Sequence, residues 1–71
     1  MMGVNQLNNY EHKLIRVKSI YYYMKRKNSE VNTHELADEF GYSTKTIVRD
    51  LRILEYNNLV LNIGRGKWLA G

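Results

Sequence analysis

Three residues, Gly41-Tyr42-Ser43, stand between two segments that each carry the pattern of an amphipathic helix. Gly41 favours a helix end, because the position after a helix often needs a positive φ that glycine adopts without a Cβ clash. Ser43 is a preferred N-cap for the helix that follows. Two helices joined by so short a turn must cross steeply. The sequence therefore predicts a helix-turn-helix, with helices over residues 33–40 and 44–56.

The residues that flank the first of these helices carry a start signal. Asn32 can cap the helix, and Glu35 three residues later can reach back to it, which would complete a capping box. Val31, just before the cap, can pack against Leu36 as a hydrophobic staple. A small residue, Ala37, sits at mid-helix and would let the next helix approach closely.

The second of these helices has two contrasting sides. Ile47, Leu51 and Leu54 recur at three- and four-residue steps, so we expect them to face the core. Asp50 and Glu55 are expected to form weak surface ion pairs with the lysine and arginine side chains of this helix. The residues predicted to face outward are Thr44, Lys45, Thr46, Val48, Arg49 and Arg52.

A longer helix is predicted over residues 9–27, upstream of the helix-turn-helix. Asn8 followed by Glu11 resembles a capping box at its start, and Asn28 can provide a left-handed cap at its end. Residues 1–8 are expected to form a flexible N-terminal segment. The apolar positions expected on the core face of this helix are Leu14, Val17, Ile20, Tyr21 and Met24.

Beyond the third helix the spacing of apolar residues changes from helical to extended. A basic, glycine-flanked tip, Gly64-Arg65-Gly66, separates two short apolar runs, which predicts a β-hairpin over residues 59–70. The fold class that follows is mainly α with a small β-hairpin, a three-helix winged helix-turn-helix that occupies residues 1–71 as a single domain.

Composition narrows the class of function. A chain of 71 residues buries only about 60% of its unfolded surface, so we expect no large catalytic cleft and no enzymatic activity. Cysteine is absent, and His12 and His34 are far apart in the sequence, so no metal, other cofactor or small-molecule ligand is predicted. The sequence has no signal peptide and no apolar run of membrane-spanning length, which favours a cytoplasmic protein.

Charge is unevenly distributed along the chain. Lysine and arginine outnumber aspartate and glutamate by 11 to 7, which gives a net charge of +4 at pH 7. Residues 1–28 carry +5, residues 29–41 carry −4, and residues 42–71 carry +3. Basic segments on both sides of one acidic segment favour a polyanionic partner such as DNA.

One string in the chain is specific. Residues 35–51 read ELADEFGYSTKTIVRDL, with Glu-Leu-Ala before the turn, Ser-x-x-Thr-Ile after it and Arg-Asp-Leu at mid-helix. In order and spacing this resembles the DeoR-type winged helix-turn-helix, over roughly residues 31–69. The resemblance implies a DNA-binding domain of a transcriptional regulator. Val48 departs from the family pattern, which usually has a second basic residue there. DeoR-type repressors also continue into a sugar-phosphate-binding effector domain, whereas this chain ends at Gly71, so effector binding is not expected.

The residues themselves point to a regulator that binds double-stranded DNA sequence-specifically. That its action is repressor-like is implied by the DeoR-type resemblance. An α-helix fits the major groove, where Arg49 can bind guanine with two hydrogen bonds and Val48 can meet a thymine methyl group. Arg65 suits a narrow minor groove, and Lys67 suits a backbone phosphate. The predicted DNA-binding residues are Ser43, Thr44, Lys45, Thr46, Val48, Arg49, Arg52, Arg65 and Lys67.

Two further interpretations stay open. Tyr21-Tyr22-Tyr23 cannot lie on one helical face, so at least one ring is expected at the surface, where it marks either a homodimer seam along helix 9–27 or a plain amphipathic helix. The acidic segment 29–41 beside exposed tyrosines favours an alternative function, a protein-interaction module that modulates a host regulator or replication factor. Abundant Asn, Tyr, Lys and Ile favour an AT-rich coding genome, and the small size suits the product of a phage, virus, plasmid or prophage.

Overall fold

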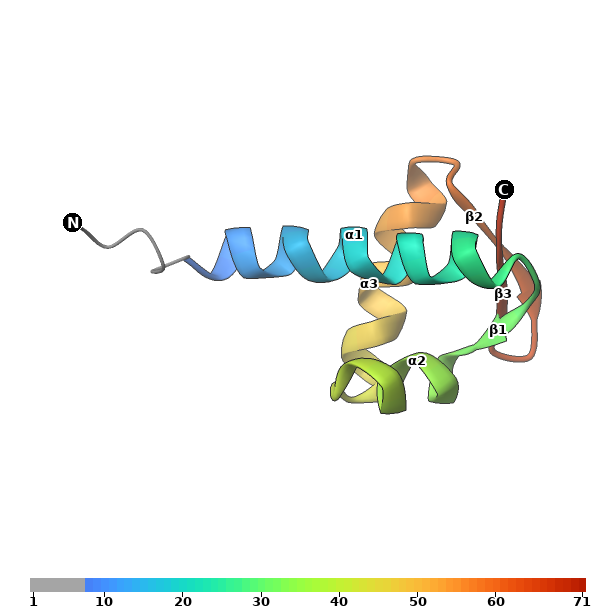
Figure 1. The fold of residues 1–71 in the computed structure, drawn as a ribbon, viewed down its shortest axis with the longest axis horizontal. Helices are drawn as coiled ribbons and strands as arrows, with labels where there is room; N and C mark the ends of the chain where they lie inside the picture. The colour runs from blue at the N-terminus through green and yellow to red at the C-terminus, as the bar shows by residue number, and fades with distance from the viewer. Residues whose placement is uncertain (1–7) are drawn as a thin grey trace.

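The computed structural model describes residues 8–71, which form three helices and a small antiparallel sheet (Figure 1). This confirms the predicted fold class, a winged helix-turn-helix. The segment expected to be flexible, residues 1–8, lies outside the described residues except for Asn8, which caps the first helix. The helices are α1 (Asn9–Lys27), α2 (Thr33–Phe40) and α3 (Thr44–Tyr56), and the strands are β1 (Val31–Asn32), β2 (Val60–Gly64) and β3 (Lys67–Ala70).

α1 is a 19-residue helix with local signals at both ends. The Asn8 side chain accepts a hydrogen bond from the backbone N–H of Glu11, at 2.8 Å, and the Glu11 side chain accepts one from the backbone N–H of Asn8, at 2.9 Å. This is the predicted capping box, which satisfies two backbone donors at the start of the helix. At the other end Asn28 adopts a φ of 54°, the predicted left-handed cap.

α1 is longer than the body that it covers. Figure 1 shows its first turns projecting beyond the other elements, while its second half passes in front of α3. Val17, Ile20 and Met24 are buried, but Leu14 is 39% exposed. The prediction that Leu14 faces the core is therefore wrong, because the helix runs past the edge of the core at that turn.

α2 begins with a cap that is only half of the predicted box. Asn32 Oδ1 accepts a hydrogen bond from the backbone N–H of Glu35 at 2.8 Å. The Glu35 carboxylate, however, accepts hydrogen bonds from the Tyr23 hydroxyl, at 2.8 Å, and from the Lys27 ammonium. The expectation that Glu35 reaches back to Asn32 is wrong, because two donors from α1 hold its carboxylate.

The core lies where the three helices and the sheet meet. α3 contributes Ile47, Leu51 and Leu54, the three residues predicted to face inward, and each buried side chain of this size stabilises the fold by roughly 1.5–3 kcal/mol. Gly41 ends α2 with a φ of 73° and so permits the sharp turn into α3. The other core residues are Val17, Ile20, Met24, Val31, Leu36, Ala37, Val60 and Trp68.

The sheet has one strand more than the predicted hairpin. Its order is β1-β3-β2, with both pairings antiparallel. Val31 in β1 lies opposite Trp68 in β3, and Val60 in β2 lies opposite Ala70. β1 is two residues long, too short to give a periodic signal in the sequence. It links the start of α2 to the wing, the hairpin formed by β2 and β3.

One hydroxyl fastens the wing to the start of α2. The Gly66 carbonyl oxygen accepts hydrogen bonds from the Thr33 backbone N–H, at 2.9 Å, and from Thr33 Oγ1, at 3.2 Å. The indole N–H of Trp68 donates to the same Thr33 Oγ1 at 3.2 Å. Thr33 and Trp68 are both buried, where water competes little for these bonds. The wing is therefore fixed in position relative to α2.

The Glu35 cluster makes stability depend on pH. Hydrogen bonds from Lys27 and then from Tyr23 lower the pKa of Glu35 below its ordinary value. A carboxyl whose pKa falls on folding contributes stability above its unfolded pKa, about 4.3, and loses that contribution as the pH drops. We therefore expect Glu35→Gln to lower the free energy of unfolding at pH 7 and to flatten its decline between about pH 5 and pH 3. Urea unfolding at several pH values measures both effects.

The matched control is Glu30→Gln, because Glu30 is exposed and stands outside this cluster. This variant should keep the wild-type dependence of stability on pH. If Glu35→Gln and the wild type lose stability equally between pH 5 and pH 3, the contacts of Glu35 with Tyr23 and Lys27 do not cause the loss of stability at low pH.

Candidate nucleic-acid interface

The outward side of α3 is the strongest candidate for a functional surface. Lys45, Arg49 and Arg52 are exposed on it, at steps of four and three residues that keep them on one side of the helix. The two ion pairs found among residues 8–71 involve other side chains, so no acid there neutralises these three cations. The result is a basic strip along α3, the second helix of the helix-turn-helix.

The smaller residues predicted to face outward are only partly exposed. Thr44, Thr46 and Val48 are half-buried at the margins of the basic strip. Ser43 is exposed, but its hydroxyl accepts a hydrogen bond from the Thr46 backbone N–H and donates one to Thr46 Oγ1, both at 3.2 Å. The hydroxyls of Ser43 and Thr46 therefore stabilise the first turn of α3 in this structure.

Asp50 does not lie on the outward side. It is fully buried on the inner face of α3, where the Arg16 guanidinium of α1 donates two hydrogen bonds to its carboxylate, Nε to Oδ2 and Nη2 to Oδ1, the second at 2.9 Å. The predicted surface pair between Asp50 and the bases of α3 is wrong, because Arg16 offers a two-pronged partner from another helix. This inward placement leaves the basic strip without an acid at its centre.

Arg16 is held from two sides. Its side chain is 16% exposed, and its hydrogen bond with Asp50 is the main reason that its pKa is raised above the ordinary value. The ring of Tyr42, in the turn between α2 and α3, has its centre 4.7 Å from the guanidinium carbon, which is a cation–π contact. Arg16 thus contacts both the turn and α3, and it fixes the orientation of α1 relative to α3.

The pair of Arg16 and Asp50 was not predicted from the sequence, although the position of Asp50 on α3 indicates that this residue is buried. Asp50 stands three residues after Ile47 and four before Leu54, which places it on the apolar side of α3. A charged side chain on such a face requires a buried partner. The partner itself, Arg16, is 34 residues away, and no local spacing identifies it.

The wing tip is a tight turn with an unusual backbone. Gly64, Arg65 and Gly66 all have positive φ, at 97°, 55° and 74°. Two positive-φ residues between the paired Gly64 and Lys67 match the twist of a two-residue hairpin, but such angles are uncommon for an arginine. Arg65 and Lys67 are both exposed, so their cations are available on the surface.

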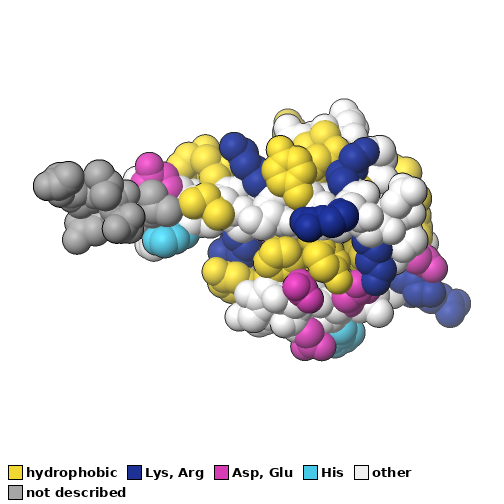
Figure 2. All heavy atoms as spheres, in the orientation of Figure 1, with side chains coloured by type: hydrophobic (Ala, Val, Ile, Leu, Met, Phe, Trp, Pro, Cys, Tyr) yellow, Lys and Arg dark blue, Asp and Glu magenta, His cyan; other side chains and the backbone are white. Residues whose placement is uncertain are grey.

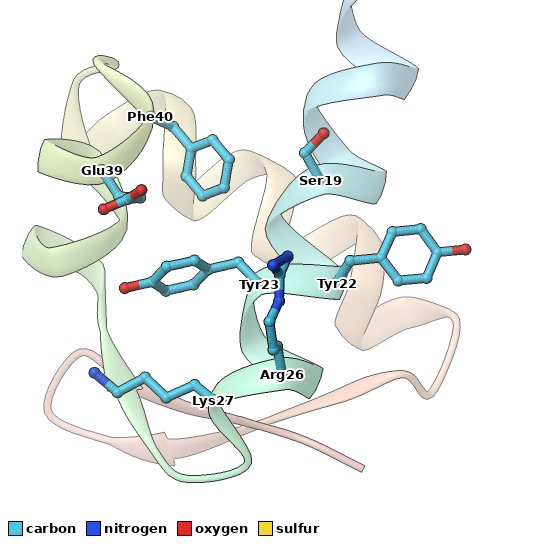
Figure 3. Close-up of a pocket in the computed structure, with 7 residues that line it drawn as sticks. All are labelled: Ser19, Tyr22, Tyr23, Arg26, Lys27, Glu39 and Phe40. Carbon is cyan, nitrogen blue, oxygen red and sulfur yellow. The ribbon is translucent and has the colours of Figure 1, made fainter.

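A shallow pocket lies elsewhere, between α1 and α2 (Figure 3). Tyr23 and Phe40 meet edge to face there, with ring centres 5.7 Å apart. None of the residues predicted to bind DNA lines this pocket. Its lining consists of Ser19, Tyr22, Tyr23, Arg26, Lys27, Glu39 and Phe40.

The two histidines, His12 and His34, are exposed. Within the described part of the chain, no three His, Cys, Asp or Glu residues are grouped so as to hold a metal ion. None of the helices in residues 8–71 combines the length and the apolarity needed to cross a membrane.

The sequence is similar to those of known proteins. Residues 16–67 match the family model described as the HTH domain, and the chain therefore belongs to this helix-turn-helix family. It is similar to a protein of Bacillus subtilis (strain 168) named "Uncharacterized HTH-type transcriptional regulator YtzE", with 51% identity over 55 residues. That similarity covers 78% of this chain and 74% of the relative. No solved structure gives a significant match.

Separating Arg16 from Asp50 should cost much of the stability. Arg16→Met leaves the Asp50 carboxylate buried without its partner, and we expect the free energy of unfolding to fall by about 3 kcal/mol. The double variant Arg16→Met/Asp50→Leu leaves no buried charge and should recover a large part of that loss. Urea denaturation of the single and double variants measures the coupling. Losses that simply add would show that the two side chains do not interact.

Proposed function

We propose that this chain is a sequence-specific, double-stranded-DNA-binding regulator of transcription, with α3 in the major groove and the wing at the minor groove. The observation that carries the proposal is the basic strip on α3, where Lys45, Arg49 and Arg52 are exposed and the central acid is turned inward. Membership of the HTH family and the name of the YtzE relative support the same class of protein.

Each part of the strip has a suitable role on a duplex. Arg49, in the middle of the strip, is the candidate for a two-hydrogen-bond contact with guanine. Val48 lies beside it and offers methyl groups to a thymine. Lys45 and Arg52 flank Arg49 and are suited to phosphates on either side of the groove. Ser43, Thr44 and Thr46 stand at the start of α3, where backbone N–H groups and the helix dipole favour a phosphate.

The wing supplies a second contact. Arg65 is exposed at the hairpin turn, and an arginine guanidinium is attracted by the strong negative potential of a narrow minor groove. Lys67, next to the tip, is suited to a backbone phosphate. DeoR-type character, indicated by residues 35–51, and a repressor-like action belong to the same proposal, since a small bound domain acts most simply by occupying DNA that other proteins need.

A salt titration tests the proposal directly. Fluorescence anisotropy with a labelled duplex should show an affinity that falls steeply with salt, because each phosphate contact contributes about −0.9 to the slope of log K against log salt concentration. Contacts by Lys45, Arg52 and Lys67 alone would give a slope of about −3. Absence of any salt-dependent binding to duplex DNA would overturn the proposed function.

Two single variants distinguish base recognition from phosphate binding. Arg49→Ala should lose about 1–3 kcal/mol at the preferred site, with a smaller loss on unrelated duplexes, because it removes a base contact. Lys67→Ala should weaken binding to all duplexes about equally and reduce the salt slope by about 1. Duplexes selected from a random pool supply the preferred site. Equal losses on all sequences for both variants would remove Arg49 from base recognition.

A further inference from the structure

A second stripe of residues runs along α1 on the side opposite its core face. Its members are separated by four, four, three and four residues, which keeps them within about 80° of one another around the helix. We call this stripe the outer face of α1, and it consists of Glu11, Ile15, Ser19, Tyr22 and Arg26. The core face of Val17, Ile20 and Met24 points the other way.

The outer face is largely exposed, with an apolar residue on each side of the half-buried Ser19. Ile15 is 52% exposed and Tyr22 is 62% exposed. Figure 3 shows Tyr23 turned toward α2 while Tyr22 points to the other side of α1, with Ser19 and Arg26 on the same helix. Figure 2 shows hydrophobic and basic side chains next to each other on this face of the molecule. Exposed aromatic and aliphatic groups arranged in this way are typical of protein interfaces.

The order of residues along the outer face makes it complementary to itself. It reads acid, apolar, small, apolar, base from Glu11 to Arg26. We propose that a second copy of this chain docks on the outer face, with the two α1 helices antiparallel around a twofold axis near Ser19. Glu11 of each copy then meets Arg26 of the other, Ile15 meets Tyr22, and the two Ser19 residues meet each other.

Three observations favour this occupant and this direction. A parallel pair would place Glu11 against Glu11 and Arg26 against Arg26, whereas the antiparallel pair matches opposite charges at both ends. Ser19 is the small residue that lets two helices approach, and its hydroxyl is already satisfied by the Ile15 carbonyl oxygen at 2.8 Å. The pocket beside Tyr22, lined by Phe40 and by several polar and charged side chains, gives a side chain of the second copy a place to enter.

The dimer has a geometric consequence for DNA, and this part alone rests on the proposed function. In Figure 1 α1 lies on the viewer's side of α3, and the basic strip of α3 is on the opposite side of that helix from its buried residues. Two copies joined through the outer faces of α1 therefore present their basic strips in opposite directions. Such a dimer holds two duplex segments, one on each side, and not two adjacent half-sites on one segment.

Self-association is tested on the full chain without DNA, so failure of DNA binding does not affect the result. Sedimentation equilibrium should show a dimer. Arg26→Glu should weaken it about tenfold by placing like charges opposite each other, and Glu11→Arg/Arg26→Glu should restore it by reversing both pairs. Lys13→Glu is the matched control, since it reverses a charge on α1 away from the outer face and should leave the dimer unchanged. Thermal unfolding verifies that each variant is folded.

Cross-linking tests the twofold axis itself. The chain contains no cysteine, so Ser19→Cys introduces a single thiol that should form a disulfide with the same residue of the second copy under mild oxidation. Lys13→Cys should form it far more slowly. A monomer at all concentrations up to about 100 µM, or equal cross-linking of the two cysteine variants, would overturn the proposal. A dimer that Arg26→Glu does not weaken would also overturn it.

Discussion

A buried carboxylate on α3 determines much of this structure. Asp50 is fully buried, and two hydrogen bonds from Arg16 compensate for its lost hydration. The pair joins the first helix to the third, and the Tyr42 ring stacked on Arg16 includes the turn in the same contact. The packing of apolar side chains brings the helices together without a directional preference. The ion pair, in contrast, requires that one particular side of α3 faces α1.

The same pair decides where charge remains on the surface. With Asp50 turned inward, the outward side of α3 keeps Lys45, Arg49 and Arg52 without a central acid. On α2, Glu35 is likewise drawn into a cluster with Lys27 and Tyr23 of α1. The basic strip is thus produced by internal ion pairing as much as by composition, since the net charge of +4 alone would not place cations on one helix.

The ends of the helices could be predicted from the sequence, whereas contacts between residues far apart in the sequence could not. Gly41 and Ser43 act on their own turns, so they define the ends of α2 and α3. The partners of Asp50 and Glu35 come from another helix and appear only when the chain is folded. Exposure of Leu14 depends on where the core ends, which periodicity along one helix cannot show. For the candidate site, the sequence indicates which side chains face outward, but not which molecule they contact.

The hydrogen bonds of Thr33 give the wing a further property. Because Gly66 and Trp68 both hydrogen-bond to Thr33, the first residue of α2, the fold restrains the wing relative to α2 and, through the short turn, to α3. The wing and α3 would then contact a duplex at a set spacing. A duplex gripped by both would have to present its neighbouring grooves at that spacing, so the domain would select DNA by its local width and twist in addition to its bases.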